Sequence, residues 1–388
     1  MTASETDIYR QPHSGSLPRA VYIHVPFCRH RCGYCDFTLV ARRDELIPRY
    51  LQALSNELST LSSVYDVETI YIGGGTPTHL SAVQLTELLQ RIGEHFRLTA
   101  GGEFTVEANP DGLDDDRLAV LVRHGVNRLS LGVQSFDEKV LQTLEREHSR
   151  EQAIDVIRRA RSFVSNLSVD LIFGVPDQSI GSWEETLKLV ADLAPEHVSA
   201  YGLTFEKGTT FYGRRHRGQL VPVPDEIERA MYQTAMTLLG ASGFEHYEIS
   251  NFAKPGFESR HNHVYWAADH YFAFGPGAAR YLNGVRSTNS RNVRRWIDGW
   301  LRHQPVLQEI DVLSDETMAR EAVFVGLRRN RGIDLQKFEQ RFRRSLKSLA
   351  PRVFDQYLKS GMLEVSAGQL RLTDEGRFVA DSVFVDFL

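Results

Sequence analysis

The cysteines carry the clearest chemistry in this sequence. There are three of them, Cys28, Cys32 and Cys35, and all lie within one short run. Three thiolates at this spacing suit a [4Fe–4S] cluster in which each cysteine binds one iron and the fourth iron keeps an open position. Disulfides cannot use up three cysteines, and so short a loop would strain any bridge. We therefore expect a cluster whose open iron is accessible for chemistry.

Zinc is the alternative that the cysteine spacing leaves open. His24 or His30 could serve as a fourth ligand beside the three thiolates, and such a site would be closed and structural. The chain would then be a zinc-stabilised scaffold without redox function. The residues that surround the cysteine loop, described below, favour the cluster.

Length and composition set broad limits on the protein. With 388 residues, the chain is long enough for one large domain and a smaller one. A net charge of -5 gives no support for nucleic-acid binding, and no apolar run approaches the roughly 20 residues of a membrane helix. The polar start predicts no signal peptide. Together with the clustered free thiols, these features predict a cytoplasmic protein without a transmembrane segment.

Short apolar runs alternate with amphipathic stretches over the first two hundred residues. The apolar runs predict parallel strands, because strands joined by such long crossovers pair in parallel. We expect strands at residues 20–24, 69–73, 103–107, 128–132, 168–173 and 198–203, and helices at residues 45–61, 81–96, 114–124, 150–163 and 180–193. Six units, short of the eight in a closed barrel, predict an α/β fold with a partial (β/α)6 barrel.

Polar or glycine-rich residues follow the predicted strands. The cysteine loop follows the first strand, and the run from Gly73 to Pro77 follows the second. Glu107 ends the third strand, and Gln134 comes soon after the fourth. Because ligands bind at the carboxyl ends of parallel strands, we expect these residues at one rim of the sheet. Asp170, inside the fifth strand, would be a costly buried charge without a partner.

The sequence pattern changes beyond about residue 215. A predicted helix at residues 225–239 precedes an aromatic- and histidine-rich segment at residues 261–271, and further helices are expected near residues 292–300 and 316–327. From about residue 334, two helices, two short strands and a terminal helix resemble a winged helix, interpreted as a packing or partner module because no basic face is evident. The domains predicted are a flexible N-terminus at residues 1–18, a core at 19–215, a barrel-completing region at 216–310 and a C-terminal α+β winged-helix-like domain at 311–388.

The run from Tyr22 to Phe37 resembles the signature of radical S-adenosylmethionine (SAM) enzymes. More narrowly, it is similar to the group that contains oxygen-independent coproporphyrinogen III oxidase and the heme chaperone HemW family. In this superfamily the open iron binds the amino and carboxylate groups of SAM, and an electron from the cluster breaks the sulfur–C5′ bond. The resemblance, which extends from about Arg19 to the C-terminus, implies a [4Fe–4S] cluster, SAM and an electron donor to the cluster.

The resemblance also assigns residues to these cofactors. It implies that Cys28, Cys32 and Cys35 bind the cluster, and that the SAM site includes Tyr22, Tyr34, Gly74, Gly75, Thr76, Glu107, Gln134, Arg146 and Asp170. Residue chemistry agrees, because glycines let a backbone approach a ligand and the planar fork of an arginine suits a carboxylate. A structural salt bridge is the alternative for Glu107, and barrel packing is the alternative for the two tyrosines.

Two features resemble the HemW branch rather than the oxidase branch. Phe37 stands where the oxidase branch has a further cysteine, and the run from His261 to Trp266 matches a His-Asn-x-x-Tyr-Trp segment associated with heme binding. A neutral histidine can bind heme iron, and aromatic rings can pack on the macrocycle. The resemblance therefore implies a heme role for His261, with His263 as an alternative ligand and a buried structural histidine as the other interpretation.

These observations predict a HemW-like heme chaperone that carries a [4Fe–4S] cluster and SAM, binds heme and transfers it to apo-hemoproteins. No residue is assigned a catalytic role, and no coproporphyrinogen oxidase activity is expected. An oxygen-independent coproporphyrinogen III dehydrogenase, which converts propionate side chains to vinyl groups by radical hydrogen abstraction, is the enzyme alternative.

Overall fold

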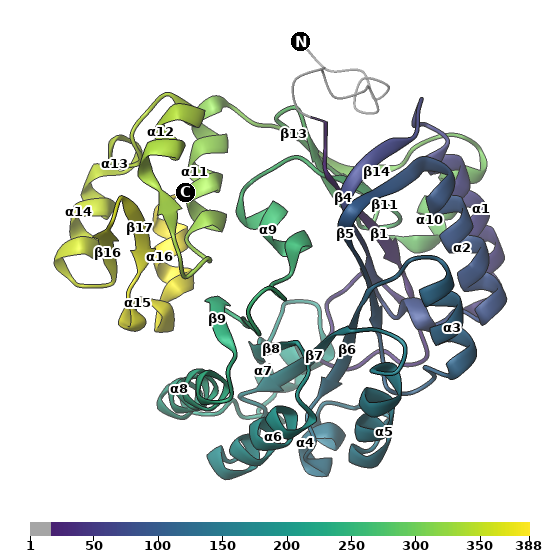
Figure 1. The fold of residues 1–388 in the computed structure, drawn as a ribbon, viewed down its shortest axis with the longest axis horizontal. Coiled ribbons are helices and arrows are strands. Elements are labelled where there is room, and N and C mark those ends of the chain that lie inside the picture. Colours follow the sequence, from purple (N-terminus) through teal and green to yellow (C-terminus); the bar gives the residue numbers. More distant parts are fainter. Residues whose placement is uncertain (1–16) are drawn as a thin grey trace.

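The fold is built around a central β-sheet (Figure 1). The structure is a computed structural model that describes residues 17–388, so nearly all of the predicted flexible N-terminus lies outside the described residues. Among the described residues, nine strands form this sheet in the order β11-β1-β4-β5-β6-β7-β8-β10-β9. All six predicted strands are present and pair in parallel: β1 (Ala20–Val25), β4 (Tyr65–Gly74), β5 (Phe96–Ala108), β6 (Arg128–Gln134), β7 (Asn166–Phe173) and β8 (His197–Gly202).

Helices cover the outer face of the sheet (Figure 1). They begin where the sequence supplies caps: the Ser81 side chain accepts from the backbone N–H of Gln84 in a capping box, and Asp114 accepts from the N–H of Arg117. Because each helix buries an apolar stripe against the strands, sheet and helices share one core. The helices are α1 (Ile47–Leu58), α2 (Ala82–His95), α3 (Asp115–Arg123), α4 (Glu138–Thr143), α5 (Arg150–Ala160) and α6 (Ile180–Leu193).

The sheet is open within residues 17–388, which confirms the partial barrel. A short strand, β11 (Phe272–Phe274), extends one edge in parallel beside β1. At the other edge, β10 (Asn251–Ala253) and β9 (Glu245–Glu248) run antiparallel. These edge strands have three or four residues each, too few for a period of two to appear in the sequence.

Segments after β8 pack around the sheet edges. They include α7 (Thr210–His216), α8 (Asp225–Ala241), α9 (Arg260–Trp266) and α10 (Val293–Leu301). A second, antiparallel sheet is formed by β12 (Ala279–Leu282), β13 (Val285–Asn289) and β14 (Leu307–Val312). The sequence interpretation predicted α8 and α10 but not this sheet.

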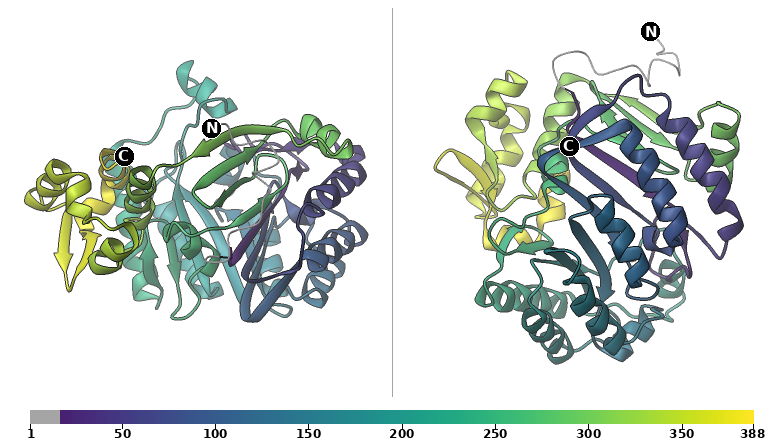
Figure 2. Two further views of the ribbon diagram at one scale, coloured as in Figure 1. Left: turned by 90° about the horizontal axis from the view of Figure 1, so that it is seen from above. Right: turned by 45° about the vertical axis from the view of Figure 1, so that its right-hand side comes forward.

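The C-terminal elements form a separate small core beside the sheet, with α9 between the two (Figures 1 and 2). The two predicted strands are present and pair antiparallel, but three helices precede them where two were predicted, two short helices follow where one was predicted, and a short strand, β15, is additional. The elements are α11 (Asp315–Gly326), β15 (Ile333–Asp334), α12 (Leu335–Phe342), α13 (Leu346–Leu349), α14 (Pro351–Lys359), β16 (Leu363–Ser366), β17 (Gln369–Leu372), α15 (Asp374–Phe378) and α16 (Ala380–Asp386). No helix in the described part of the chain is long and apolar enough to cross a membrane.

Candidate functional site

The cysteine loop is fixed at its base and at its middle. Two short strands, β2 (Phe27–Cys28) and β3 (Val40–Ala41), pair in parallel and close the base. In the middle, the carbonyl of Gly33 accepts a hydrogen bond from the N–H of Phe211 at 2.8 Å. A Cβ on Gly33 would lie 2.6 Å from the Phe211 ring, so only glycine fits here. Helix α7 therefore holds the loop against the carboxyl ends of the strands.

The three thiols line one cavity of about 930 Å³. Cys28 is 8% exposed, and burial raises the pKa of its thiol to about 12, although the Thr76 hydroxyl 3.3 Å away opposes this rise. Burial also raises the pKa of Cys35. Buried thiolates need nearby positive charge. Three thiols that line one cavity fit the donor set of a [4Fe–4S] cluster with an open iron.

A chain of hydrogen bonds joins two of the cysteines across the rim. The Asn109 amide donates to the Thr76 hydroxyl at 2.9 Å, and the Asn109 oxygen accepts from Arg146 at 2.7 Å. The other terminal nitrogen of Arg146 lies 3.7 Å from the thiol of Cys32. Since Thr76 contacts Cys28, the chain runs from Cys28 to Cys32 and places a fixed cation beside the cluster ligands. The Nε of Arg146 is buried and has no hydrogen-bond partner among the described residues.

Of the two histidines considered as zinc ligands, His24 is committed to other contacts. His24 uses Nδ1 with the Tyr22 hydroxyl at 2.9 Å and Nε2 with the Thr38 carbonyl at 2.6 Å, so neither ring nitrogen is left for zinc. His30 lies 3.7 Å from Glu145. Within residues 17–388, no group of three or more histidine, cysteine or acidic side chains is placed to hold a single metal ion.

Each of the three glycines at the end of β4 meets a different neighbour at close range. A Cβ on Gly73 would lie 2.8 Å from the Glu107 carboxyl carbon, and one on Gly75 would lie 2.7 Å from the Phe27 carbonyl oxygen. Gly74 has φ +114°, and a Cβ there would lie 2.6 Å from the His24 ring. The three glycines therefore let this turn sit against both the cysteine loop and the end of β5.

Glu107 lines the cavity with both carboxylate oxygens held. One accepts from the Tyr71 hydroxyl at 2.7 Å, and the other accepts from the N–H of Gly74 at 2.9 Å. Burial raises its pKa to about 7, while these two hydrogen bonds act in the opposite sense. The predicted alternative of a structural salt bridge is not found within residues 17–388, where the two carboxylate oxygens accept from the Tyr71 hydroxyl and the Gly74 N–H instead. A buried carboxylate beside a glycine turn is suited to accept from a cationic amine.

Two further predicted residues lie deeper in the same cavity. Asp170 accepts from the hydroxyls of Ser199 at 2.7 Å and Ser130 at 2.8 Å, and burial raises its pKa. Serine hydroxyls thus solvate this carboxyl. Gln134, the last residue of β6, has φ +65°. A left-handed backbone at a non-glycine residue costs energy and is concentrated at functional sites.

The comparisons with known proteins agree with this geometry. The model of the Radical SAM superfamily matches residues 22–190, and that of the HemN C-terminal domain matches residues 313–379. The heme chaperone HemW of Bacillus subtilis is 38% identical over 95% of this chain and 99% of its own length. That of Lactococcus lactis is 37% identical over 96% of this chain and 97% of its own length. The chain belongs to the HemW family of radical SAM proteins.

The HemW-family chain also has a solved structural neighbour over nearly its whole length. The structure of coproporphyrinogen III oxidase (HemN) from Escherichia coli, a radical SAM enzyme, matches with a TM-score of 0.84 at 23% identity. The match covers 96% of this chain and 90% of that one. At this identity the similarity shows the fold, including its C-terminal part. Membership of the superfamily implies a [4Fe–4S] cluster and SAM, and the thiols, glycine turn and carboxylates described above fit both.

The segment that matches the HemW branch forms α9. His261 is 1% exposed. Its Nδ1 is bonded to the Thr69 hydroxyl at 2.8 Å and its Nε2 to the Tyr265 hydroxyl at 2.8 Å. The ring does not line the cavity. Heme ligation by His261 stays a prediction, and it would require breaking one of these two bonds.

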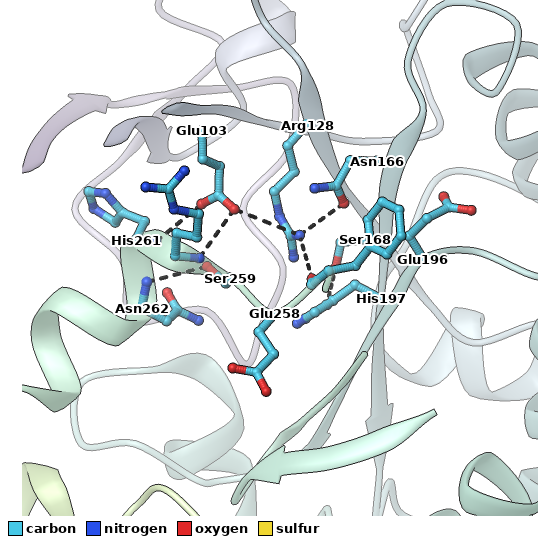
Figure 3. A network of polar contacts seen from close by, with 12 residues as sticks. Glu103, Arg128, Asn166, Ser168, Glu196, His197, Glu258, Ser259, His261 and Asn262 are labelled. Carbon is cyan, nitrogen blue, oxygen red and sulfur yellow. Dashed lines mark hydrogen bonds and ion pairs between the residues drawn. The ribbon is translucent and has the colours of Figure 1, made fainter. Parts of the chain in front are cut away.

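Glu103 on β5 holds the start of α9 (Figure 3). Its two oxygens accept from the backbone N–H groups of Arg260 at 3.2 Å and His261 at 3.1 Å. Arg128, at the start of β6, lies 4.0 Å from the same carboxylate. These donors are helix N-terminal N–H groups, which a carboxylate satisfies well. Glu103 thus ties the start of α9 to strand β5.

The structure divides the predicted cofactor residues into two groups. The two that do not line the cavity are Tyr22, which packs beside Tyr71 and bonds His24, and His261. Those that line it together are Cys28, Cys32, Tyr34, Cys35, Gly74, Gly75, Thr76, Glu107, Gln134, Arg146 and Asp170. Their roles toward the cofactors remain proposals.

Sequence reasoning missed Tyr71 and did not assign a role to Asn109. Tyr71 lies in β4 between Ile70 and Ile72, on the same face as Thr69. Hydroxyl side chains at alternate positions of an otherwise apolar strand were the available signal, because alternate residues share a face. For Asn109, the only signal in the sequence was its position shortly after Glu107. Its two hydrogen bonds depend on residues 33 and 37 positions away along the chain.

Proposed function

We propose that this protein is a heme chaperone that carries a [4Fe–4S] cluster and SAM, binds heme and transfers it to apo-hemoproteins. One observation carries the proposal: a single cavity of about 930 Å³ joins the three thiols at one end to arginines of the C-terminal part at the other. A volume of this order is within the usual range for ligand sites. It leaves room for a carboxylate-bearing ligand beside the cofactor site.

The arginine end of the cavity supports binding of an anionic macrocycle. Arg328 and Arg377 line it, and the Nε of each is buried without a hydrogen-bond partner among the described residues. Glu248, the acid near Arg328, is 3.9 Å away. The Arg328 guanidinium lies 4.7 Å from the centre of the Trp266 ring, which belongs to the HemW segment. A terminal nitrogen of Arg377 pairs with Asp374 at 2.8 Å, and the Nε–H groups of the two arginines, unpaired within residues 17–388, suit the propionates of heme.

Acidic side chains at the same end limit how a ligand would enter. Asp225, Glu228 and Asp381 also line the cavity. Burial raises the pKa of Glu228, which favours its neutral form. Propionates would therefore approach the two arginines rather than the wall formed by α8.

The residues at the thiol end are proposed to hold the cluster and SAM. Cys28, Cys32 and Cys35 would bind three irons, and Glu107 with the Gly74 turn would receive the SAM amino group. When bound, the cluster would supply an open iron and one electron. Arg146 would keep a positive charge at the thiolates, and an electron donor would act from outside. We place the protein in the cytoplasm, where thiols stay reduced.

Relatives favour the chaperone over an oxidase. The HemW proteins noted above are named heme chaperones and align over nearly their full length. Phe37, where the resemblance expects a cysteine in the oxidase branch, is 57% exposed at the cavity. The oxidase remains the alternative, because a porphyrinogen also carries carboxylates.

The test uses one anaerobically reconstituted sample for two assays. Hemin titration is expected to give a saturable absorbance change, and the loaded protein is expected to pass heme to the apo form of a b-type cytochrome. The same sample is expected not to convert coproporphyrinogen III. Turnover of coproporphyrinogen at a rate typical of enzymes would overturn the choice. Arg328→Gln and Arg377→Gln should weaken hemin binding, whereas Arg295→Gln, exposed on α10, should not.

A further inference from the structure

We propose that His261 and Tyr71 are positioning residues of the SAM site: His261 fixes the Tyr71 ring, and the Tyr71 hydroxyl orients Glu107. The inference rests on the proposed binding of SAM by Glu107 and the Gly74 turn. It gives the HemW segment a role in SAM binding, although the sequence associates it with heme.

The first step is the immobilisation of His261. Both ring nitrogens are bonded to hydroxyls, those of Thr69 and Tyr265, and its backbone N–H is held by Glu103. Burial lowers the pKa of the ring to about 3, so the imidazole is neutral. The ring is held through both nitrogens and the backbone is held by Glu103, so the ring cannot turn without breaking buried hydrogen bonds.

The second step is the contact between His261 and Tyr71. Their ring centres are 5.0 Å apart with an angle of 30° between the planes. Tyr22 also stacks on Tyr71, with ring centres 6.0 Å apart and an angle of 29°. Tyr71 therefore packs against two aromatic rings, one from α9 and one from β1. Such packing restricts where its hydroxyl can point.

The third step leads from Tyr71 to the cofactor turn. Its hydroxyl donates to Oε1 of Glu107 at 2.7 Å, and Oε2 of Glu107 accepts from the N–H of Gly74 at 2.9 Å. Each carboxylate oxygen can accept two hydrogen bonds and here accepts one, so one acceptor site on each remains. Because Glu107 lines the cavity, these sites can receive a cationic amine. A continuous series of contacts thus links α9 to the SAM turn.

Removing the Tyr71 hydroxyl has two expected effects on Glu107. The carboxylate loses a donor that fixes its orientation, and it loses a hydrogen bond that opposes the rise of its pKa through burial. The groups that face Glu107 are Tyr71 and the Gly74 N–H, with Asp170 raising its pKa further; Tyr22 and Tyr201 also interact with it. In Tyr71→Phe the carboxylate would therefore ionise at a higher pH.

The experiment measures SAM and heme separately on cluster-loaded protein. SAM affinity is measured by equilibrium dialysis and by the change that SAM causes in the electron paramagnetic resonance spectrum of the reduced cluster. Tyr71→Phe is expected to bind SAM about tenfold more weakly at pH 7, as for loss of a hydrogen bond to a charged group. Its affinity should recover toward higher pH. His261→Phe should weaken SAM binding, whatever its effect on hemin affinity.

Controls separate this inference from the proposed function. Tyr281→Phe removes a hydroxyl from β12, away from the cavity, and should leave SAM affinity unchanged. Glu107→Gln should weaken SAM binding and abolish its dependence on pH near 7, and it serves if Tyr71→Phe fails to fold. Unchanged SAM affinity in Tyr71→Phe, or loss of hemin binding alone in His261→Phe, would overturn the inference. Failure of the unsubstituted protein to bind SAM or hemin would instead overturn the proposed function.

Discussion

Asn109 accepts a hydrogen bond from Arg146 at 2.7 Å and so holds the guanidinium beside the cysteine loop. The same amide donates to Thr76, whose hydroxyl contacts the buried thiol of Cys28. A neutral side chain with one donor and one acceptor is what this position requires, because Thr76 and Arg146 need opposite partners. The relationship makes Asn109 a structural link between two of the proposed cluster ligands, Cys28 and Cys32.

Asn109→Ala should therefore lower the amount of cluster that the protein retains. Thr76 would lose a donor, and Arg146 would lose one of two acceptors, because its nitrogen still donates to the Gly132 carbonyl at 2.9 Å; each lost hydrogen bond costs about 0.5–1.5 kcal/mol. Iron and sulfide are measured per chain after anaerobic reconstitution and gel filtration. Asn109→Asp is the matched variant, since it restores the acceptor for Arg146 but not the donor to Thr76. Its iron and sulfide content should lie between those of the unsubstituted protein and Asn109→Ala. Full cluster content in Asn109→Ala would mean that Asn109 does not support the cluster site.

Gly74→Ala should damage the SAM turn. The residue has φ +114°, and the added Cβ would lie 2.6 Å from the His24 ring, so backbone strain of about 1–3 kcal/mol and a steric shift act together. SAM affinity and the free energy of unfolding should both fall. Gly93→Ala provides the control: Gly93 lies in α2 with nothing within 4 Å of an added Cβ. That change should stabilise the protein by about 0.5–1 kcal/mol, and equal effects of the two would contradict the assignment.

Glu103→Ala should release the start of α9. The substitution removes the acceptor for the N–H groups of Arg260 and His261 and leaves Arg128 buried without its acid (Figure 3). Breaking a buried pair in this way costs about 3–5 kcal/mol. Urea denaturation measures the loss. Glu103→Gln keeps one acceptor oxygen and should lose less, whereas equal losses would mean that the charge rather than the clamp is what matters.

Much of the core fold could be predicted from the sequence because its elements are long and strongly patterned. The six parallel strands were recovered, and Ser81 and Asp114 marked helix starts through their capping side chains. Strands β9, β10 and β11 could not be predicted. They are too short to show a period, and their pairing depends on partners such as β1 that lie far away in the chain.

Most residues of the candidate site could be predicted, but the hydrogen bonds between them could not. Residues at the ends of strands were found because the rim of a parallel sheet collects them, and most of them line one cavity. The orientation of His261 could not be predicted. A histidine in an aromatic segment is equally compatible with a metal ligand and with a buried hydrogen-bonded ring, and only the positions of Thr69 and Tyr265 separate the two.

Buried histidines predict a loss of stability in mild acid. Burial lowers the pKa of His24, His148 and His246 to about 4 and that of His261 to about 3. Between these values and the ordinary value of about 6.5, the unfolded chain binds protons that the folded chain does not. Stability from each ring is therefore present above pH 6.5 and is lost as pH falls, by up to about 1.4 kcal/mol per pH unit.

Two buried carboxyls oppose this trend. Burial raises the pKa of Glu57 and Glu107 to about 7, so near pH 5–6 the folded chain keeps protons that the unfolded chain has released. Their contribution is present at low pH and is lost as pH rises toward 7. Burial also raises the pKa of Asp170 and Glu248, so the slope for the whole protein combines opposing contributions, and the effect of one histidine has to be isolated by substitution.

A single substitution isolates one histidine in this balance. In His261→Phe one titrating ring is removed, so the slope of unfolding free energy against pH between 5 and 6.5 should decrease by about 1.4 kcal/mol per unit. Urea denaturation at a series of pH values, with iron content checked at each, measures the slope. His303→Asn is the control, because His303 is exposed and has φ +54°, which asparagine tolerates. Its slope should match that of the unsubstituted protein. An unchanged slope in His261→Phe would mean that the ring takes up a proton in the folded chain as it does in the unfolded chain. A protonated ring carries an N–H on both nitrogens, so neither nitrogen could accept a hydrogen bond from Thr69 or Tyr265.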